Sequence, residues 1–254
     1  MRIHHARNAT LFIETADQVV LVDPMLGPKG TMPPFSFFRA KPRKNPLVDY
    51  PESSRAILER VTHCLITHKH PDHIDDAAVA FLKERQIPVT CSAKDRAFYE
   101  KKGIKVVQGL AYWAKQEFLG GSIVGIPARH GYGFIAGPMG HVMGFHIELP
   151  NEPSVYLSAD TIYTDDVKRA LTELKPDISV VAAGSAQFDI GQPLLMRVDD
   201  VIRFMQDAPG KVIANHLEAI NHCPTTRAEL RERVSNERLT DRVLIPEDGE
   251  VMPF

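Results

Sequence analysis

Short apolar runs alternate with polar and turn-forming segments along most of the chain. Near the start, segments 10–14 and 19–23 are rich in aliphatic residues and are separated by only four positions. Two such runs joined by a short link predict a pair of antiparallel strands. Asp23-Pro24 then ends the second strand, because proline has no N–H to donate to a sheet.

Beyond residue 55, helix-like and strand-like segments follow each other in turn. The first group of predicted helices and strands lies at 56–61, 64–67, 76–85, 89–91, 93–102 and 105–107. Segments within 109–127 and 141–159 are typical of antiparallel strands, with a glycine-rich bend at 130–133 between them. The alternation resumes at 164–173, 178–181, 194–205, 212–214, 225–234 and 243–245. This order predicts an α/β fold, a four-layer αββα sandwich of two mixed sheets.

Segment 25–52 is rich in proline and glycine and is too irregular for a helix or a strand. A loop of this length in a compact domain is usually functional, so we expect either a lid or a partner contact. Its basic side chains stand beside three phenylalanines: Phe35, Phe37, Phe38, Arg39, Lys41, Arg43 and Lys44. They fit either a site for an anionic substrate or a solvated face with a subunit contact, and we favour the second interpretation.

Composition limits the classes of protein that fit. The 254 residues are 44% hydrophobic, which predicts one domain over 1–254 with a large core. A formal charge of -2 argues against a nucleic-acid-coating surface. Cys64, Cys91 and Cys223 lack the spacing of a disulfide or CxxC framework and indicate reduced thiols. No apolar run reaches membrane-spanning length and no signal peptide is evident, so we expect a cytoplasmic protein without membrane or nucleic-acid partners.

Four potential metal ligands crowd into the six positions after the predicted strand 64–67. They are His68, His70, Asp72 and His73. In an extended segment, residues two apart point the same way, so His68 and His70 can bind one ion. Asp72 and His73 follow the turn at Pro71 and can reach a second ion. Imidazole and carboxylate together suit divalent zinc, manganese or iron.

Three further ligands are expected where distant predicted strands end. His130 follows segment 123–129, Asp160 follows segment 155–159, and His216 follows strand 212–214. His222 competes with His216 for the last position. We prefer His216 because it directly follows a strand, whereas His222 lies near a helix start and becomes a candidate substrate contact.

Taken together, these seven residues resemble the metallo-β-lactamase superfamily, whose hydrolases carry a His-x-His-x-Asp-His loop, a later His, a bridging Asp and a final His. The resemblance implies that His68, His70 and His130 hold one metal ion, that Asp72, His73 and His216 hold the other, and that Asp160 bridges both. Segments 23–26, 73–75 and 158–161 are similar to the branch that contains ascorbate-6-phosphate lactonase. Ala159 departs from that branch, in which glycine often precedes the bridging aspartate.

The expected function is that of a dinuclear metal-dependent hydrolase with zinc or manganese, or with iron as an alternative. A hydroxide between the two metal ions would attack a small ester, lactone or phosphoester, and Asp72 is the candidate general base. A phosphodiesterase or nuclease with the same metals is one alternative, and a non-catalytic metal-binding sensor is another. The expected partner is a small molecule, either neutral or anionic, and assembly into a homo-oligomer stays open.

Two acids and several polar residues are candidates for supporting roles. Asp23 and Asp75 are placed to fix imidazole orientation, although a helix N-cap is an equal alternative for Asp75. The candidate substrate contacts are Arg129, Tyr132, His141, Gln187 and His222. Among the other histidines, His4 and His5 are expected to be an exposed terminal pair, and His63 and His146 are expected to be buried in strands.

Overall fold

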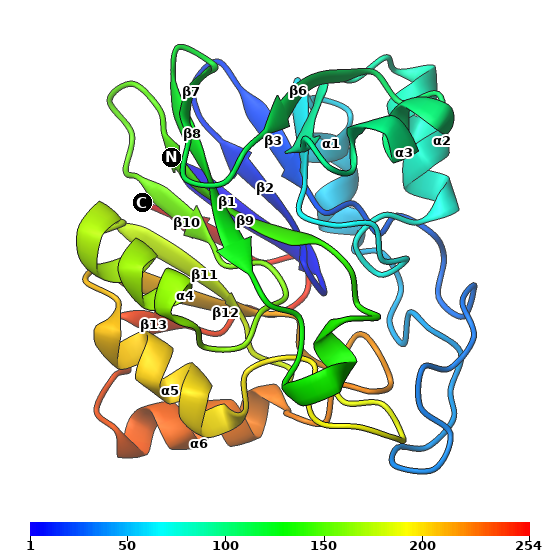
Figure 1. The fold of residues 1–254 in the computed structure, drawn as a ribbon, viewed down its shortest axis with the longest axis vertical. Helices are drawn as coiled ribbons and strands as arrows, with labels where there is room; N and C mark the ends of the chain where they lie inside the picture. Colours follow the sequence, from blue (N-terminus) through cyan, green and yellow to red (C-terminus); the bar gives the residue numbers. More distant parts are fainter.

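Two seven-stranded sheets face each other in the computed structural model, which describes residues 1–254 (Figure 1). The first sheet has the order β14-β1-β2-β3-β4-β5-β6 and the second has the order β13-β12-β11-β10-β9-β8-β7. The strands of the first sheet are β1 (Arg2–Arg7), β2 (Thr10–Glu14), β3 (Val19–Val22), β4 (His63–Ile66), β5 (Val89–Ser92), β6 (Val106–Leu110) and β14 (Val251–Pro253). Those of the second are β7 (Lys115–Phe118), β8 (Gly121–Ala128), β9 (Val142–Glu148), β10 (Val155–Leu157), β11 (Ile178–Ala182), β12 (Lys211–Asn215) and β13 (Val243–Leu244).

Both sheets are mixed, as the sequence predicts. Strands β14, β1, β2 and β3 pair antiparallel, and β3, β4, β5 and β6 pair parallel. In the second sheet, β7 to β10 pair antiparallel, and β10 to β13 pair parallel. The loops that follow the parallel strands therefore gather at the carboxyl edge of each sheet.

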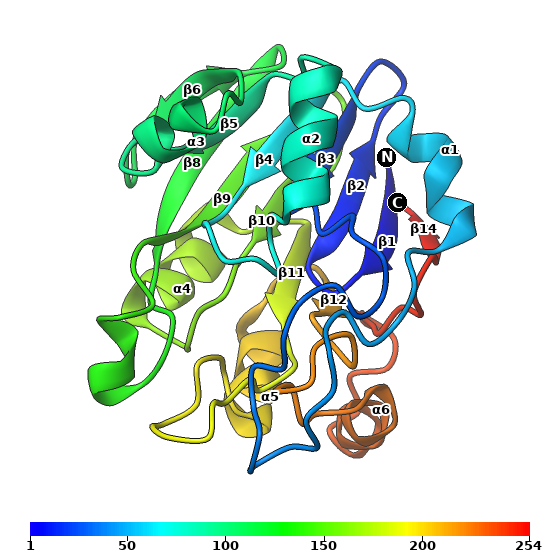
Figure 2. The ribbon, with the colours of Figure 1, turned by 90° about the vertical axis from the view of Figure 1, so that its right-hand side faces the viewer.

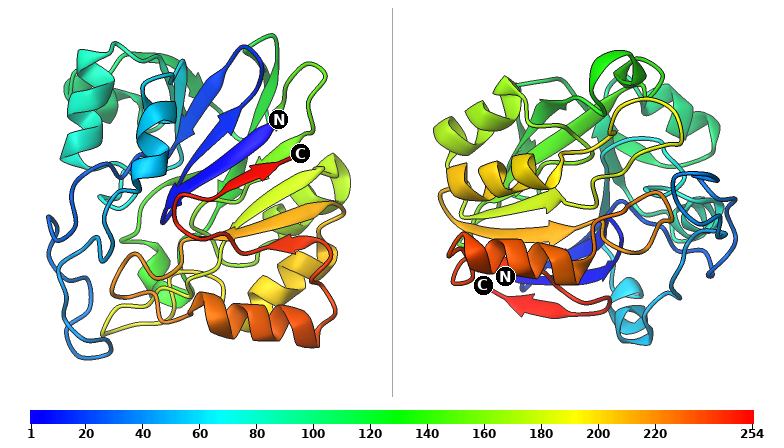
Figure 3. Two further views of the ribbon diagram at one scale, coloured as in Figure 1. Left: turned by 180° about the vertical axis from the view of Figure 1, so that it is seen from behind. Right: turned by 90° about the horizontal axis from the view of Figure 1, so that it is seen from below.

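Helices cover the two outer faces of the sheet pair (Figures 2 and 3). The first sheet carries a 3₁₀ turn (Glu52–Ser54), α1 (Arg55–Leu58), α2 (Asp76–Glu84) and α3 (Arg96–Lys101). The second sheet carries α4 (Asp165–Arg169), a π-helical continuation (Ala170–Leu174), α5 (Val198–Asp207) and α6 (Arg227–Asn236), and a 3₁₀ turn (Gly133–Ala136) lies in the bend after β8. The predicted four-layer sandwich is confirmed.

Three apolar cores hold the four layers together. Leu65 of the first sheet and Phe145 of the second belong to the core between the sheets. Leu82 of α2 packs into the core under the first sheet. Phe204 of α5 stacks on Tyr156 under the second, with ring centroids 6.2 Å apart. Alternating side chains of each strand thus serve two cores, which explains why so many strand positions are apolar.

The predicted helix at 194–205 is wrong at its start. Helix α5 begins at Val198, and the segment before it is extended and buried. The backbone N–H of Leu194 donates to Ala186 O at 2.7 Å, and that of Met196 donates to Thr161 O at 3.2 Å. These tertiary hydrogen bonds outweigh the local helical preference.

The prediction of an exposed histidine pair at the N-terminus is also wrong. His4 and His5 lie within β1, and His5 is buried. The Nδ1 of His5 lies 3.1 Å from Glu247 O because the C-terminal segment returns to pair with β1. His63 and His146 are buried in strands as predicted, and all three cysteines are free and buried.

Segment 25–52 is fastened to the rest of the molecule at several points. The buried guanidinium of Arg7 donates to Met25 O at 2.9 Å and to Val48 O at 2.8 Å. Asn221 N donates to Asn45 Oδ1 at 2.8 Å, and Asn221 Nδ2 donates to Ser36 O at 2.7 Å. Chain segments far apart in sequence thus hold this irregular loop against the carboxyl edges of the strands (Figure 2).

None of the helices is long and apolar enough to span a membrane.

Removing the Phe145 side chain tests the core between the sheets. Phe145 is fully buried, so we expect Phe145→Ala to lower the free energy of unfolding by about 3–5 kcal/mol. Phe38→Ala is the matched control, because Phe38 is 92% exposed, and it should change that free energy by less than about 0.5 kcal/mol. Urea denaturation followed by circular dichroism measures both, and equal effects would contradict this account of the core.

Candidate metal centre

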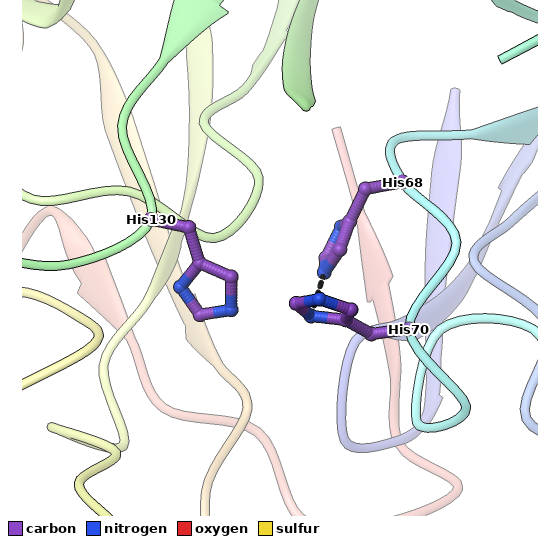
Figure 4. Close-up of side chains that lie close together, drawn as sticks. All are labelled: His68, His70 and His130. Atoms are coloured by element: carbon purple, nitrogen blue, oxygen red, sulfur yellow. Dashed lines mark hydrogen bonds between the residues drawn. The ribbon is translucent and has the colours of Figure 1, made fainter. Parts of the chain in front are cut away.

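The seven residues predicted as ligands meet where the carboxyl edges of the two sheets face each other. His68, His70, Asp72 and His73 lie in the loop after β4 of the first sheet. The second sheet contributes three residues, which follow β8, β10 and β12: His130, Asp160 and His216. Figure 4 shows His68 and His70 on one side and His130 on the other, with their rings directed toward one another.

These side chains form three overlapping groups whose ligand atoms lie within 4.8 Å of one another. The groups are His68, His70 and His130; His68, His73 and Asp160; and Asp72, His73 and His216. His68 Nε2 lies 3.0 Å from His70 Nδ1. Asp160 Oδ2 lies 3.3 Å from His73 Nε2, 3.5 Å from His130 Nε2 and 3.6 Å from His216 Nε2. The Asp160 carboxylate is therefore central to the arrangement.

Hydrogen bonds on the outer side of two rings, those of His130 and His68, determine which nitrogen faces the centre with a lone pair. His130 Nδ1 donates to Leu194 O at 3.0 Å, since a carbonyl can only accept. Thr67 Oγ1 donates to the Asp23 carboxylate at 2.7 Å, so His68 Nδ1 donates to Thr67 Oγ1 at 2.9 Å. Neutral imidazoles in these tautomers direct bare Nε2 atoms inward, as metal-binding histidines do.

Buried carboxylates make the centre favourable for positive charge. Burial opposes protonation of His73, yet the carboxylates of Asp160 and Asp23 outweigh it and raise the pKa of His73 to about 10. The carboxylates of Asp160 and Asp72 likewise raise the pKa of His216 against the effect of burial. Burial instead dominates at His130 and lowers its pKa to about 4. The buried carboxylates of Asp23, Asp72 and Asp160 thus favour positive charge at the centre.

Two buried atoms at the centre have no hydrogen-bond partner. They are His73 Nε2 and Asp160 Oδ1. Buried polar atoms are nearly always paired, so this position suits an additional positive group. The donor set of imidazole nitrogens and carboxylate oxygens fits a divalent transition metal or zinc.

Asp23 positions the first-sheet half of the centre. Its carboxylate accepts hydrogen bonds from His73 Nδ1 at 2.9 Å, Thr67 N at 2.8 Å and Thr67 Oγ1 at 2.7 Å. Asp75 does not act in this way. Its carboxylate accepts from Ala78 N at 2.8 Å as the N-cap of α2 and from Gly27 N at 2.6 Å, so it fastens segment 25–52.

Sequence reasoning missed two residues that contact the His216 side of the centre. Asn8, in the turn between β1 and β2, accepts from His216 N at 2.9 Å and donates to Asp72 O at 3.0 Å. The Sγ of Cys223 lies 3.5 Å from His216 Nδ1. Burial alone would raise the pKa of Cys223, but His222 and His216 lower it to about 7. Nothing in the local sequence around Asn8 or Cys223 indicates these tertiary contacts.

Three strands end in a left-handed residue that directs a side chain at the centre. Asp23 has φ +45°, Ala159 has φ +58° and His216 has φ +60°. Residues other than glycine adopt this backbone conformation at a cost in free energy. Such strained residues are concentrated at functional sites. Ala159 directly precedes Asp160, and glycine would adopt the same backbone conformation there without that cost.

An open pocket lies against the centre. Its lining consists of Phe35, His70, Pro71, Asp72, His130, Met139, Asp160, Phe188, Leu194 and His222. Apart from His222, the lining residues that are not metal-ligand candidates are therefore apolar, and the lining includes neither lysine nor arginine. Phe35 comes from segment 25–52, whereas Phe37 and the basic side chains that follow it are exposed.

Of the predicted substrate contacts, only His222 lines this pocket. Arg129 is exposed, and Tyr132 donates to Asp200 from the side of the bend. Gln187 Nε2 donates to Gly191 O at 2.9 Å within its own turn. His141 is partly buried outside the pocket lining, and its Nε2 has no hydrogen-bond partner.

The sequence profile of the family described as "Beta-lactamase superfamily domain" matches residues 18–216. That range includes all seven candidate ligands. The chain is 33% identical over 257 aligned residues to "UPF0173 protein YddR" of Bacillus subtilis (strain 168), and the alignment covers 100% of both chains. It is also 28% identical to a "UPF0173 metal-dependent hydrolase" of Koribacter versatilis, over 53% of this chain and 58% of that protein.

Solved structures are similar over the full chain. A possible metal-dependent hydrolase from Veillonella parvula DSM 2008 superposes with a TM-score of 0.90 at 29% identity, over 99% of this chain and 98% of that one. An isothiocyanate hydrolase from Delia radicum gut bacteria also gives a TM-score of 0.90, at 30% identity over 100% of this chain and 99% of that one.

Replacing Asp23 tests its positioning role. Asp23→Asn removes the charge and one acceptor beside His73, so we expect metal affinity to fall by about 10–100-fold. Asp76→Asn is the control, because Asp76 is exposed on the neighbouring helix α2, and it should leave the affinity unchanged. Competition with a chromophoric chelator measures both, and an unchanged affinity in Asp23→Asn would contradict the role.

Proposed function

Because the chain belongs to the metallo-β-lactamase superfamily and to its UPF0173 metal-dependent hydrolases, we propose that it hydrolyses small, uncharged substrates at an electrophilic carbon. The observation that carries this proposal is the pocket. Its lining combines Asp72 and Asp160 of the candidate metal centre with the apolar side chains of Phe35, Phe188 and Leu194. A substrate that carries an apolar group beside its reacting carbon fits such a lining.

In this proposal, two divalent metal ions are held by the predicted ligands. His68, His70 and His130 hold one, Asp72, His73 and His216 hold the other, and Asp160 is shared. Zinc or manganese is favoured, with iron as the alternative. When bound, such ions supply Lewis acidity and make a water molecule more acidic.

The residues of the chain then divide the remaining tasks. Asp72 is ionised, since His216 and His73 hold its pKa below the usual range despite burial, and it is the candidate acceptor for the proton of the attacking water. Asp23 fixes the ring of His73. The apolar side chains of Phe35, Phe188 and Leu194 exclude water from the pocket and orient the substrate.

The pocket favours an ester, a lactone or an isothiocyanate over a phosphoester. No lysine or arginine lines it, whereas phosphate sites commonly use such cations. This disfavours a phosphodiesterase or nuclease and also the phosphorylated lactone suggested by the motif resemblance. The isothiocyanate candidate comes from the similar hydrolase of Delia radicum gut bacteria. Water would add to the central carbon of R–N=C=S to give a thiocarbamic acid, which divides into an amine and carbonyl sulfide.

A substrate panel tests the proposal on protein reconstituted separately with zinc and manganese. We expect turnover of an aryl ester, a lactone or benzyl isothiocyanate, with little or none of bis(p-nitrophenyl) phosphate. Asp72→Asn should lower kcat by about 10²–10⁴-fold, and Asp76→Asn should not. Preferred turnover of the phosphodiester, or equal rates in both variants, would overturn the proposal.

A further inference from the structure

His222 lines the pocket but belongs to none of the three candidate metal-ligand groups. Its ring stacks on Phe188, with centroids 5.4 Å apart and an interplanar angle of 17°. The ring of Phe35 meets it edge-on, with centroids 5.2 Å apart and an angle of 85°. The two aromatic contacts fix the plane in which the imidazole lies.

The two ring nitrogens of His222 have different surroundings. Nδ1 faces the Sγ of Cys223 at 4.0 Å. Nε2 makes no hydrogen bond within the chain, although His222 is buried and lines the pocket. The backbone behind the ring is also held, since Gln187 N donates to His222 O at 2.9 Å.

We propose that His222 is the general acid that protonates the leaving group of the hydrolysed substrate. The proposal rests on the proposed function and adds the proton donor that it lacks. As the bond from the acyl carbon to the leaving oxygen breaks, the electron pair stays on that oxygen and the proton of Nε2 joins it. The neutral imidazole then takes a proton from solvent. With an isothiocyanate, the same proton goes to nitrogen as the C–N bond of the thiocarbamate breaks.

The other lining residues leave this role to His222. His130 uses Nδ1 on Leu194 O and directs Nε2 at Asp160. His70 Nδ1 faces His68 Nε2 at 3.0 Å. The remaining lining outside the metal-ligand groups is Phe35, Pro71, Met139, Phe188 and Leu194, which carry no dissociable proton. Histidine is also the commonest general acid in enzymes.

Two esters with the same acyl group and different leaving groups test the proposal. A p-nitrophenyl ester releases a stable anion that needs no proton, whereas an ethyl ester releases an alkoxide that does. We expect His222→Gln to lower kcat/KM for the ethyl ester by about 10²–10⁴-fold and that for the p-nitrophenyl ester by less than about tenfold. Metal content, measured on the same samples, should not change.

Two further variants separate proton donation from packing. Phe188→Leu keeps the imidazole and loses the stacked ring, so it should lower both kcat/KM values by the same factor. His63→Gln replaces a buried histidine of β4 that is hydrogen-bonded to Thr90 of β5, and both kcat/KM values should stay unchanged. An equal loss on both esters in His222→Gln, no loss on either, or a loss of metal would overturn the role of His222. A wild-type protein inactive on every substrate in the panel would overturn the proposed function and this role together.

Discussion

Charge balance between Asp72, Asp160 and the imidazoles around them is the constraint on which the centre depends. Both carboxylates are buried, and burying a charge without a partner is strongly unfavourable. The partners come from both sheets, since His73 follows β4 and His216 follows β12. Bringing together the carboxyl edges of the two sheets therefore places both carboxylates among the imidazoles that balance them.

The pocket beside this centre brings apolar side chains next to the charged ones, since Phe35 and Phe188 line it together with Asp72 and Asp160. Phe35 reaches the pocket only because segment 25–52 is fastened by Arg7, by Asn221 and by the cap residue Asp75. In each of these contacts a buried polar side chain is hydrogen-bonded to a backbone atom of the irregular segment. The pocket thus combines residues of the candidate metal centre with a side chain from segment 25–52.

Local spacing predicted much of the fold and the positions of the centre, because strands and helices follow short periodic patterns. The His68 to His73 loop and the strand-end residues His130, Asp160 and His216 came together as expected. The contacts of Asn8 and Cys223 with His216 could not be predicted, since they join residues that no pattern relates. The burial of His5 and the late start of α5 were missed for the same reason: distant segments supply the hydrogen bonds.

The left-handed backbone at Asp23 and His216 has a consequence for how such a chain can be improved. Glycine would relax the backbone at both positions and would remove the side chains that the centre uses. At Asp23 such a change would relieve the backbone but leave the buried donors of Thr67 and His73 without their acceptor. The backbone strain at Asp23 and His216 is therefore the energetic cost of directing these two side chains at the centre.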